Sequence, residues 1–233
     1  MKTLAHLALL TALLVAAAAA CVTGPGADAA YVEATLLTRY LAADGRVTAE
    51  ASLSKRDSTR GLDSLYVSPG GVAFLGSDLK RASRSATAQR YRETVRAASA
   101  PDTRFALTNL AGERVTIAGT LRPFDTLIMG PLPTHNFGFT VYPADAADVL
   151  GAGEELTALF VPDEGQARTG TILGPSAPGE GYHFPRNSVA DWPLGEGTLS
   201  FIRRRRTPIA AAGVRGELTE EVYTRPVRSA VVN

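Results

Sequence analysis

The sequence has one cysteine, three histidines and almost no net charge, and each scarcity excludes a class of protein. A single cysteine cannot form an intramolecular disulfide or a thiolate-rich metal site. The 24 basic and 23 acidic side chains give no overall attraction to nucleic acid, so nucleic acid is not expected as a partner. There is no phosphate-cradling glycine loop and no dinucleotide fingerprint, so no cofactor is expected. The remaining composition, 45% hydrophobic and 20% charged, suits a globular protein of one large or two small domains.

The N-terminal stretch predicts export. Met1 and Lys2 supply a positive start, and residues 4–20 are apolar apart from His6 and Thr11. At about 1.5 Å per residue, a helix over this stretch is roughly 25 Å long, shorter than the ~30 Å hydrocarbon core of a bilayer. A positive start, a short apolar segment and small residues at its end are typical of a signal peptide rather than a membrane span.

The end of this stretch, Ala18-Ala19-Ala20-Cys21, resembles the lipobox of bacterial lipoproteins. The resemblance implies cleavage between Ala20 and Cys21, acylation at Cys21 by chains such as palmitate, and the lipid bilayer as a partner. Residues 1–20 are then the signal peptide and residues 21–30 a flexible tether. Val22 is not the aspartate that retains many lipoproteins at the inner membrane, so we expect the outer membrane, facing either the periplasm or the outside. The alternative is an ordinary signal peptide with an incidental cysteine.

From residue 31 onward the hydrophobic pattern is typical of β-strands. Apolar and polar residues alternate from Val47 to Leu53, as on a half-buried strand, and Asp44-Gly45 predicts a tight hairpin turn ahead of it. No sustained helical period is present, although residues 144–150 are a candidate for one or two helical turns. Further strands are expected over residues 31–41, 65–67, 72–75, 89–96, 104–108, 113–121, 126–129, 137–142, 155–161, 169–173, 182–184, 199–203, 215–223 and 227–232.

The spacing of the turn signals favours β-sandwich domains. Pro123 interrupts the pattern, which predicts an all-β protein of two tandem antiparallel sandwiches, residues 31–122 and 123–233. A single closed barrel of 12 or more strands is the alternative.

Residues 65–79, with the strand Gly70-Gly71-Val72-Ala73-Phe74 followed by a short turn and a leucine, resemble a recurring segment of secreted Bacteroidetes lipoproteins. Residues 89–92, 105–112 and 218–227 continue the likeness. The resemblance implies tandem immunoglobulin-like folds and brings no catalytic residues with it.

Few side chains suit catalysis or metal binding. His135 lies in a predicted loop. His183 lies between Tyr182 and Phe184, and in a strand its side chain would point to the face opposite these two aromatic side chains. No serine lies in a Gly-x-Ser-x-Gly elbow. Loop carboxylates suit calcium or a hydrolase, but they form no Asp-x-Asp-x-Asp-Gly pattern, so we expect no catalytic residue and no metal site. These acidic pairs are Asp145 and Asp148, Glu154 and Glu155, and Asp163 and Glu164.

Two basic clusters are candidate sites for anionic ligands such as lipid head groups, lipopolysaccharide or acidic glycans. In strand register Arg90, Arg92 and Arg96 share one face. A central strand cannot bury two unpaired arginines, so the second cluster is expected at a sheet edge or a strand end. The alternative is that both clusters are solvated and paired with nearby acidic residues. The second cluster is the run Arg203, Arg204, Arg205 and Arg206.

Trp192 is the only tryptophan and is a candidate aromatic contact for a sugar; otherwise it closes the end of a sandwich. Together these features predict a lipid-anchored protein of the bacterial envelope with a non-catalytic role in binding, scaffolding or assembly. Its expected partners, besides the bilayer, are other envelope proteins or acidic glycans. The alternatives are an envelope hydrolase using carboxylates or His183, and a barrel-shaped carrier of lipids or small molecules.

Overall fold

The computed structural model describes residues 30–57, 59–119, 127–144, 149–173 and 181–233. These ranges hold β-strands and one short 3-10 helix, η2 (Arg186–Ser188), and they contain no α-helix. No helix within them is long and apolar enough to cross a membrane. The expected all-β class is therefore confirmed. Cys21 and the cleavage site before it lie outside the described residues, as do residues 145–148 of the helical turns expected over residues 144–150.

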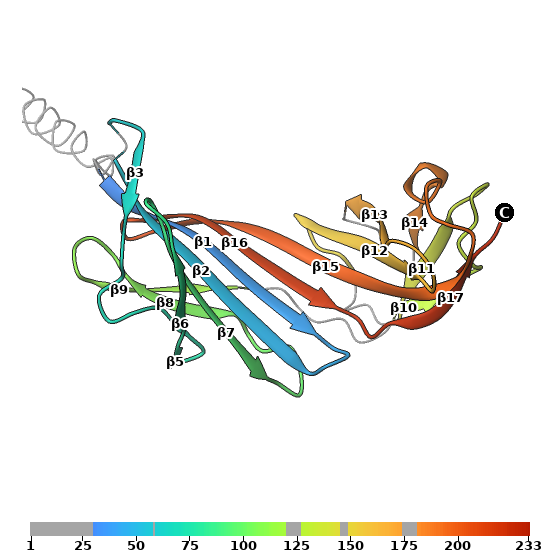
Figure 1. Ribbon diagram of the computed structural model, residues 1–233, viewed down its shortest axis with the longest axis horizontal. Helices are drawn as coiled ribbons and strands as arrows, with labels where there is room; N and C mark the ends of the chain where they lie inside the picture. Colours follow the sequence, from blue (N-terminus) through green and yellow to red (C-terminus); the bar gives the residue numbers. More distant parts are fainter. Residues whose placement is uncertain (1–29, 58, 120–126, 145–148, 174–180) are drawn as a thin grey trace, which may run out of the picture.

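The largest unit is a ten-stranded sheet that runs along the length of the molecule (Figure 1). Its strands are β1 (Ala30–Leu41), β2 (Arg46–Asp57), β3 (Leu62–Leu65), β6 (Lys80–Arg84), β7 (Gln89–Arg96), β12 (Glu154–Pro162), β13 (Arg168–Leu173), β15 (Gly195–Ala211), β16 (Val214–Tyr223) and β17 (Val227–Val231). The strand order is β13-β12-β15-β16-β1-β2-β7-β6, with β17 paired to β15 and β3 paired to β2.

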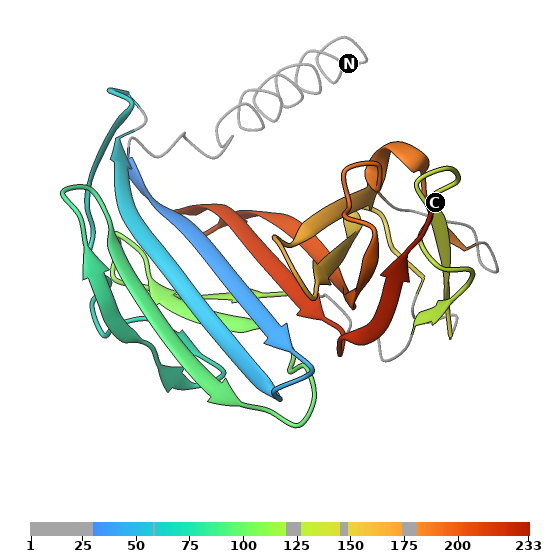
Figure 2. The same ribbon diagram turned by 45° about the vertical axis from the view of Figure 1, so that its right-hand side comes forward.

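Two smaller sheets pack on this large sheet, one toward each end (Figure 2). The four-stranded sheet has the order β5-β4-β8-β9, and the three-stranded sheet has the order β10-β11-β14. Their strands are β4 (Ala73–Phe74), β5 (Ser77–Asp78), β8 (Arg104–Thr108), β9 (Arg114–Ala118), β10 (Leu127–Met129), β11 (Phe139–Pro143) and β14 (Tyr182–Phe184).

The hairpin predicted at Asp44-Gly45 joins β1 to β2. The Asp44 N–H donates to the Leu41 carbonyl (3.2 Å), and Gly45 has a φ of 58°, a left-handed value that glycine adopts without steric cost. Val47, Ala49, Ala51 and Leu53 are buried and Glu50 and Ser52 are partly exposed, as the predicted alternation requires, although Thr48 is buried as well. The local pattern therefore placed both the strand and its turn correctly.

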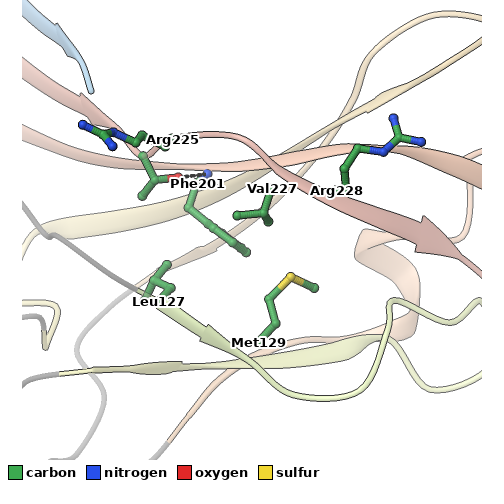
Figure 3. Close-up of a pocket in the computed structure, with 7 residues that line it drawn as sticks. Leu127, Met129, Phe201, Arg225, Val227 and Arg228 are labelled. Atoms are coloured by element: carbon green, nitrogen blue, oxygen red, sulfur yellow. Dashed lines mark hydrogen bonds between the residues drawn. The ribbon is translucent and has the colours of Figure 1, made fainter. Parts of the chain in front are cut away.

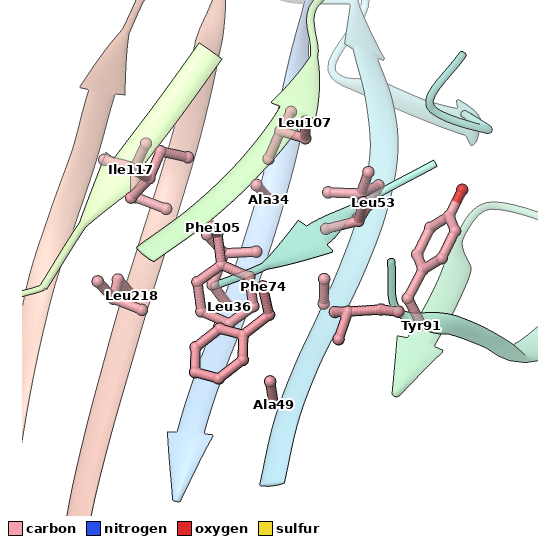
Figure 4. Close-up of a cluster of buried hydrophobic side chains, with 14 of the residues drawn as sticks. Ala34, Leu36, Ala49, Leu53, Phe74, Tyr91, Phe105, Leu107, Ile117 and Leu218 are labelled. Carbon is pink, nitrogen blue, oxygen red and sulfur yellow. The ribbon is translucent and has the colours of Figure 1, made fainter. Parts of the chain in front are cut away.

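The first hydrophobic core lies between the four-stranded sheet and the large sheet (Figure 4). Leu36 and Leu53 of the large sheet face Phe74 and Phe105, whose ring centroids are 5.0 Å apart. Ile209, Val214, Leu218 and Val222, from β15 and β16, belong to the same core. Strands from the C-terminal part of the chain thus complete the core of the N-terminal part, and the boundary between the two cores does not fall at residue 122.

β16 joins the N-terminal part by pairing with β1, and this pair is parallel, although antiparallel sheets were expected. The approach of the two strands is close at Gly216, which has a φ of 135° and lies opposite Ala34. A Cβ at this position would collide with the carbonyl of Ala34, so only glycine fits without a shift of the backbone.

The second core lies between the three-stranded sheet and the part of the large sheet formed by β12, β15 and β17. Trp192 stacks on Phe160 at 5.5 Å with an interplanar angle of 7° and is tilted against Phe139 at 5.8 Å. Leu199 and Phe201 of β15 complete the packing. The described residues therefore form two separate cores that share one large sheet.

Candidate functional site

The arginines of β7 lie on one exposed face, as the strand register predicts. Arg90, Arg92 and Arg96 are exposed, whereas Tyr91 between them is buried in the first core. β2 pairs with β7 so that Arg46 lies opposite Arg96, and like charges directly opposite each other in a sheet repel.

The edge strand β6 adds Lys80 to this surface, because Lys80 lies opposite Arg92. Arg81 and Arg84 lie opposite Tyr91 and Gln89, so their side chains are on the other face of the sheet. Within β2 and β7, Glu50 lies 3.3 Å from Arg92, and Glu93 lies 3.3 Å from Lys80 of β6. We call the resulting surface the basic face. It is formed by Arg46, Lys80, Arg90, Arg92 and Arg96.

The shape of the basic face is that of a row. At about 3.3 Å per residue, Arg90 and Arg96 are roughly 20 Å apart along β7. Arg92 lies between them on the same face. Such a row matches an extended chain of negative charges better than a single phosphate. Sequence reasoning missed Arg46, and only the register of the β1–β2 hairpin against β7 brings it to this row.

The run from Arg203 to Arg206 is not at an edge, and that expectation is wrong. β15 lies between β12 and β16 in the middle of the large sheet. Arg203 is buried and donates from Nε to Glu154 Oε2 (2.9 Å) and from Nη2 to the Val149 carbonyl (3.1 Å). The Gly151 N–H also donates to Glu154 (2.9 Å). Acidic partners on the neighbouring strand thus let a central strand carry a buried arginine.

Arg204 points to the opposite face of the sheet, into a ladder of ion pairs. It donates from Nε to Glu221 Oε1 (2.8 Å) and from Nη1 to Glu155 Oε1 (2.6 Å), and Arg39 donates from Nε to Glu221 Oε2 (2.8 Å). These four side chains come from β1, β16, β15 and β12, which are neighbours in the sheet. We call this set the charge ladder.

Glu221 is the centre of the charge ladder. Burial by itself raises the pKa of this carboxyl, but the hydrogen bonds and positive charges of Arg39 and Arg204 together outweigh burial, so the pKa lies below its ordinary value of 4.5. Arg204 therefore has a structural role, in which its guanidinium joins β15 to β16 and β12. Of the rest of the run, Arg205 lies 3.7 Å from Glu154 and Arg206 is exposed.

Trp192 is 1% exposed, so neither face of its ring is available to a sugar. The candidate aromatic contact is corrected to a core residue at the end of the second sandwich. Its carbonyl lies 2.6 Å from His135 Nε2, which ties the His135 loop to this core.

Of the remaining candidate groups, His183 and Asp163 make structural contacts and Glu164 is exposed. His183 is exposed on β14 while Tyr182 and Phe184 are buried, as predicted, and its Nδ1 lies 3.1 Å from Thr140 Oγ1. The Asp163 carboxylate accepts two hydrogen bonds from Arg228. Within the described ranges, no group of three or more His, Cys, Asp or Glu side chains is arranged to hold a metal ion. Asp145 and Asp148 lie outside the described residues.

A cleft of about 350 Å³ opens beside the second core (Figure 3). Leu127 and Met129 of β10 form one wall, and Phe201 and Val227 point toward them from the large sheet. Sequence reasoning missed this cleft, because β10 is only three residues long and its facing strands are more than 70 residues away along the chain.

No protein-family model and no curated protein matches this sequence. Among solved structures, the adhesin InvE of Yersinia pseudotuberculosis is similar at 15% sequence identity and a TM-score of 0.24. The similarity covers 81% of this chain and 58% of the InvE chain, which is less than two thirds of its length. A likeness this distant carries no argument about fold or function.

Replacing Arg203 by methionine should destabilise the protein by about 3–5 kcal/mol, because it leaves the Glu154 carboxylate buried without its main partner. The double variant Arg203→Met, Glu154→Leu should recover most of this loss, since no buried charge remains. Urea unfolding measures the free energy of unfolding of both variants, provided that the m-value stays the same as in the wild type. A loss below about 1 kcal/mol for Arg203→Met would show that the pair is not a structural tie.

Replacing Glu221 by glutamine should lower the free energy of unfolding by about 1–3 kcal/mol at pH 7. Because the folded-state pKa is lowered, the carboxylate contributes fully above its ordinary pKa of 4.5, and the contribution is lost as pH falls through the folded value. The difference between wild type and variant should therefore shrink as the pH is lowered from 5 to 3. Glu217→Gln, at an exposed position of the same strand, is the control. A pH-independent difference contradicts the role of the Glu221 charge.

Proposed function

We propose that this protein is an exported, lipid-anchored protein of the bacterial envelope that binds a linear acidic glycan on its basic face without catalysing a reaction. The observation that carries the proposal is the row of exposed arginines on β7, extended by Arg46 and by Lys80 of β6. A carboxylate or sulfate chain laid along this row relieves the repulsion between Arg46 and Arg96.

Anchoring through Cys21 complements binding on this face. The tether of residues 21–30 ends where β1 begins, and β1 belongs to the same sheet as the basic face. An acylated Cys21 holds the protein at a membrane through more than one acyl chain, which is enough for stable attachment. A surface row of arginines can then bind an envelope polymer while the anchor keeps the protein in place.

The non-catalytic part of the proposal is supported by the carboxylates. Within the part of the chain that the structure describes, Asp57, Asp163 and Glu221 have carboxyl groups with a lowered pKa, whereas a general acid needs a raised one. Hydrogen bonds from Thr59 lower the pKa of Asp57, and those from Arg228 lower the pKa of Asp163.

Cys21→Ser should release the protein from the membrane. Wild type expressed in a bacterial host should partition into the detergent phase and carry a fatty-acyl mass by mass spectrometry, while the variant should remain in the aqueous phase. Ser54→Ala, in the folded part of the chain, is the control for handling. A Cys21→Ser variant that still partitions with detergent refutes acylation at this residue.

The triple variant Arg90→Glu, Arg92→Glu, Arg96→Glu should weaken binding to heparin, used as a linear acidic glycan, by at least about tenfold at 0.15 M salt, as expected for loss of several ion pairs. Isothermal titration calorimetry measures the affinity, with neutral dextran as the negative probe. The matched control Arg60→Glu, Arg104→Glu, Arg186→Glu makes the same change in net charge at exposed positions elsewhere. Equal weakening by both triples, or no heparin binding by wild type, contradicts the basic face as the site.

A further inference from the structure

The cleft beside the second core has the form of a ligand site. It lies between two strands that each form the edge of a sheet, β10 of the three-stranded sheet and β17 of the large one. Its apolar walls are Leu127 and Met129 on one side and Phe201 and Val227 on the other (Figure 3). The space between the two sheets is therefore open at this side.

Three of the four apolar side chains that line the cleft are more exposed than their neighbours in the second core, and the fourth, Phe201, is buried. Val227 is 45% exposed and Leu127 and Met129 are half-buried, while Leu199 and Phe184 in the same core are fully buried. On β10 the alternation is regular, because Ile128 points to the outside and is 55% exposed. Filling the cleft with an apolar group would remove this inward-facing surface from water.

The charges at the rim differ in their partners. Arg228 is held by Asp163 (2.7 and 2.9 Å) and by Glu196 (2.8 Å), so its charge is compensated. Arg225, on the other side of Phe201 and Val227, is exposed, and no acidic side chain of the described residues forms an ion pair with it. Thr224 accepts the Phe201 N–H through Oγ1 (2.9 Å) and keeps its hydroxyl proton for donation. The rim thus offers one uncompensated positive charge and one hydroxyl donor.

The volume sets the size of the ligand. The cleft of about 350 Å³ is at the lower end of the range for small-molecule sites. If each methylene occupies roughly the 30 Å³ that a water molecule takes up in the liquid, the cleft holds about ten to twelve carbons.

We propose that the cleft between β10 and β15–β17 binds one amphipathic carboxylate, with an alkyl chain of about ten to twelve carbons between Leu127, Met129, Phe201 and Val227 and its carboxylate at Arg225. This site is separate from the basic face and does not depend on glycan binding. The ligand of this second site is a free fatty acid, which an acyl-ester hydrolase would release as its product.

The test uses the full chain carrying Cys21→Ser in detergent-free buffer, with dodecanoate below its micelle-forming concentration as the probe. Isothermal titration calorimetry should give saturable binding with one site. Dodecanol and butyrate should each bind at least tenfold more weakly, since one lacks the charge and the other the chain.

Met129→Trp should fill the cleft and weaken dodecanoate binding at least tenfold. Ile128→Trp places the same ring on the outer face of the same strand and should leave the affinity within twofold. Near-ultraviolet circular dichroism checks that Met129→Trp is folded. If it is not, Val227→Trp replaces it, because Val227 is a half-exposed position on the opposite wall of the cleft. Arg225→Gln should weaken dodecanoate binding about tenfold and leave dodecanol binding unchanged.

Three results overturn the proposal. These are the absence of saturable dodecanoate binding, equal affinities for dodecanoate and dodecanol, and equal effects of Ile128→Trp and the folded cleft-filling variant. Heparin binding by the basic face is measured separately, so failure of either site leaves the other result intact.

Discussion

Strand β15 is the element on which the rest of the molecule depends. One face of this strand contributes Leu199 and Phe201 to the second core and Ile209 to the first. Between these two apolar stretches the same face carries Arg203, whose guanidinium is bound to Glu154. The buried apolar side chains of β12 and β15 already specify the register of this pair, and the Arg203–Glu154 ion pair adds a polar contact that a slipped register would break.

The arginines of this protein therefore have two physical roles that depend on their surroundings. Where neighbouring strands bring carboxylates alongside, as at Arg203 and Arg204, the guanidinium is a structural group that joins strands. Where the neighbouring positions are neutral or basic, as at Arg90 and Arg96, the charge faces solvent without compensation. The proposed binding of anionic ligands follows from this second environment rather than from the number of arginines, since the whole chain is nearly neutral.

The two proposed sites use different parts of the same architecture. The basic face lies on an exposed sheet surface near the edge strand β6, which suits a long polymer. The cleft at Leu127 and Phe201 lies between two sheet edges, which suits a short chain that can be enclosed. In each case the proposed binding depends on arginines that make no ion pair within the described residues, Arg90 and Arg96 on the basic face and Arg225 at the cleft.

The sequence by itself determined the local elements: the all-β class, the β1–β2 hairpin at Asp44-Gly45, the alternation of β7 and the outward direction of His183. These follow from side chains within a few residues of one another, through the two-residue period of strands and the turn preference of glycine. Only the tertiary structure decided that β16 pairs in parallel with β1, that the Arg203 run lies in a central strand, and that Trp192 is buried. Each of these depends on contacts between residues far apart in the chain, such as Arg203 with Glu154 and Arg39 with Glu221, and no local pattern encodes which distant carboxylate meets which arginine.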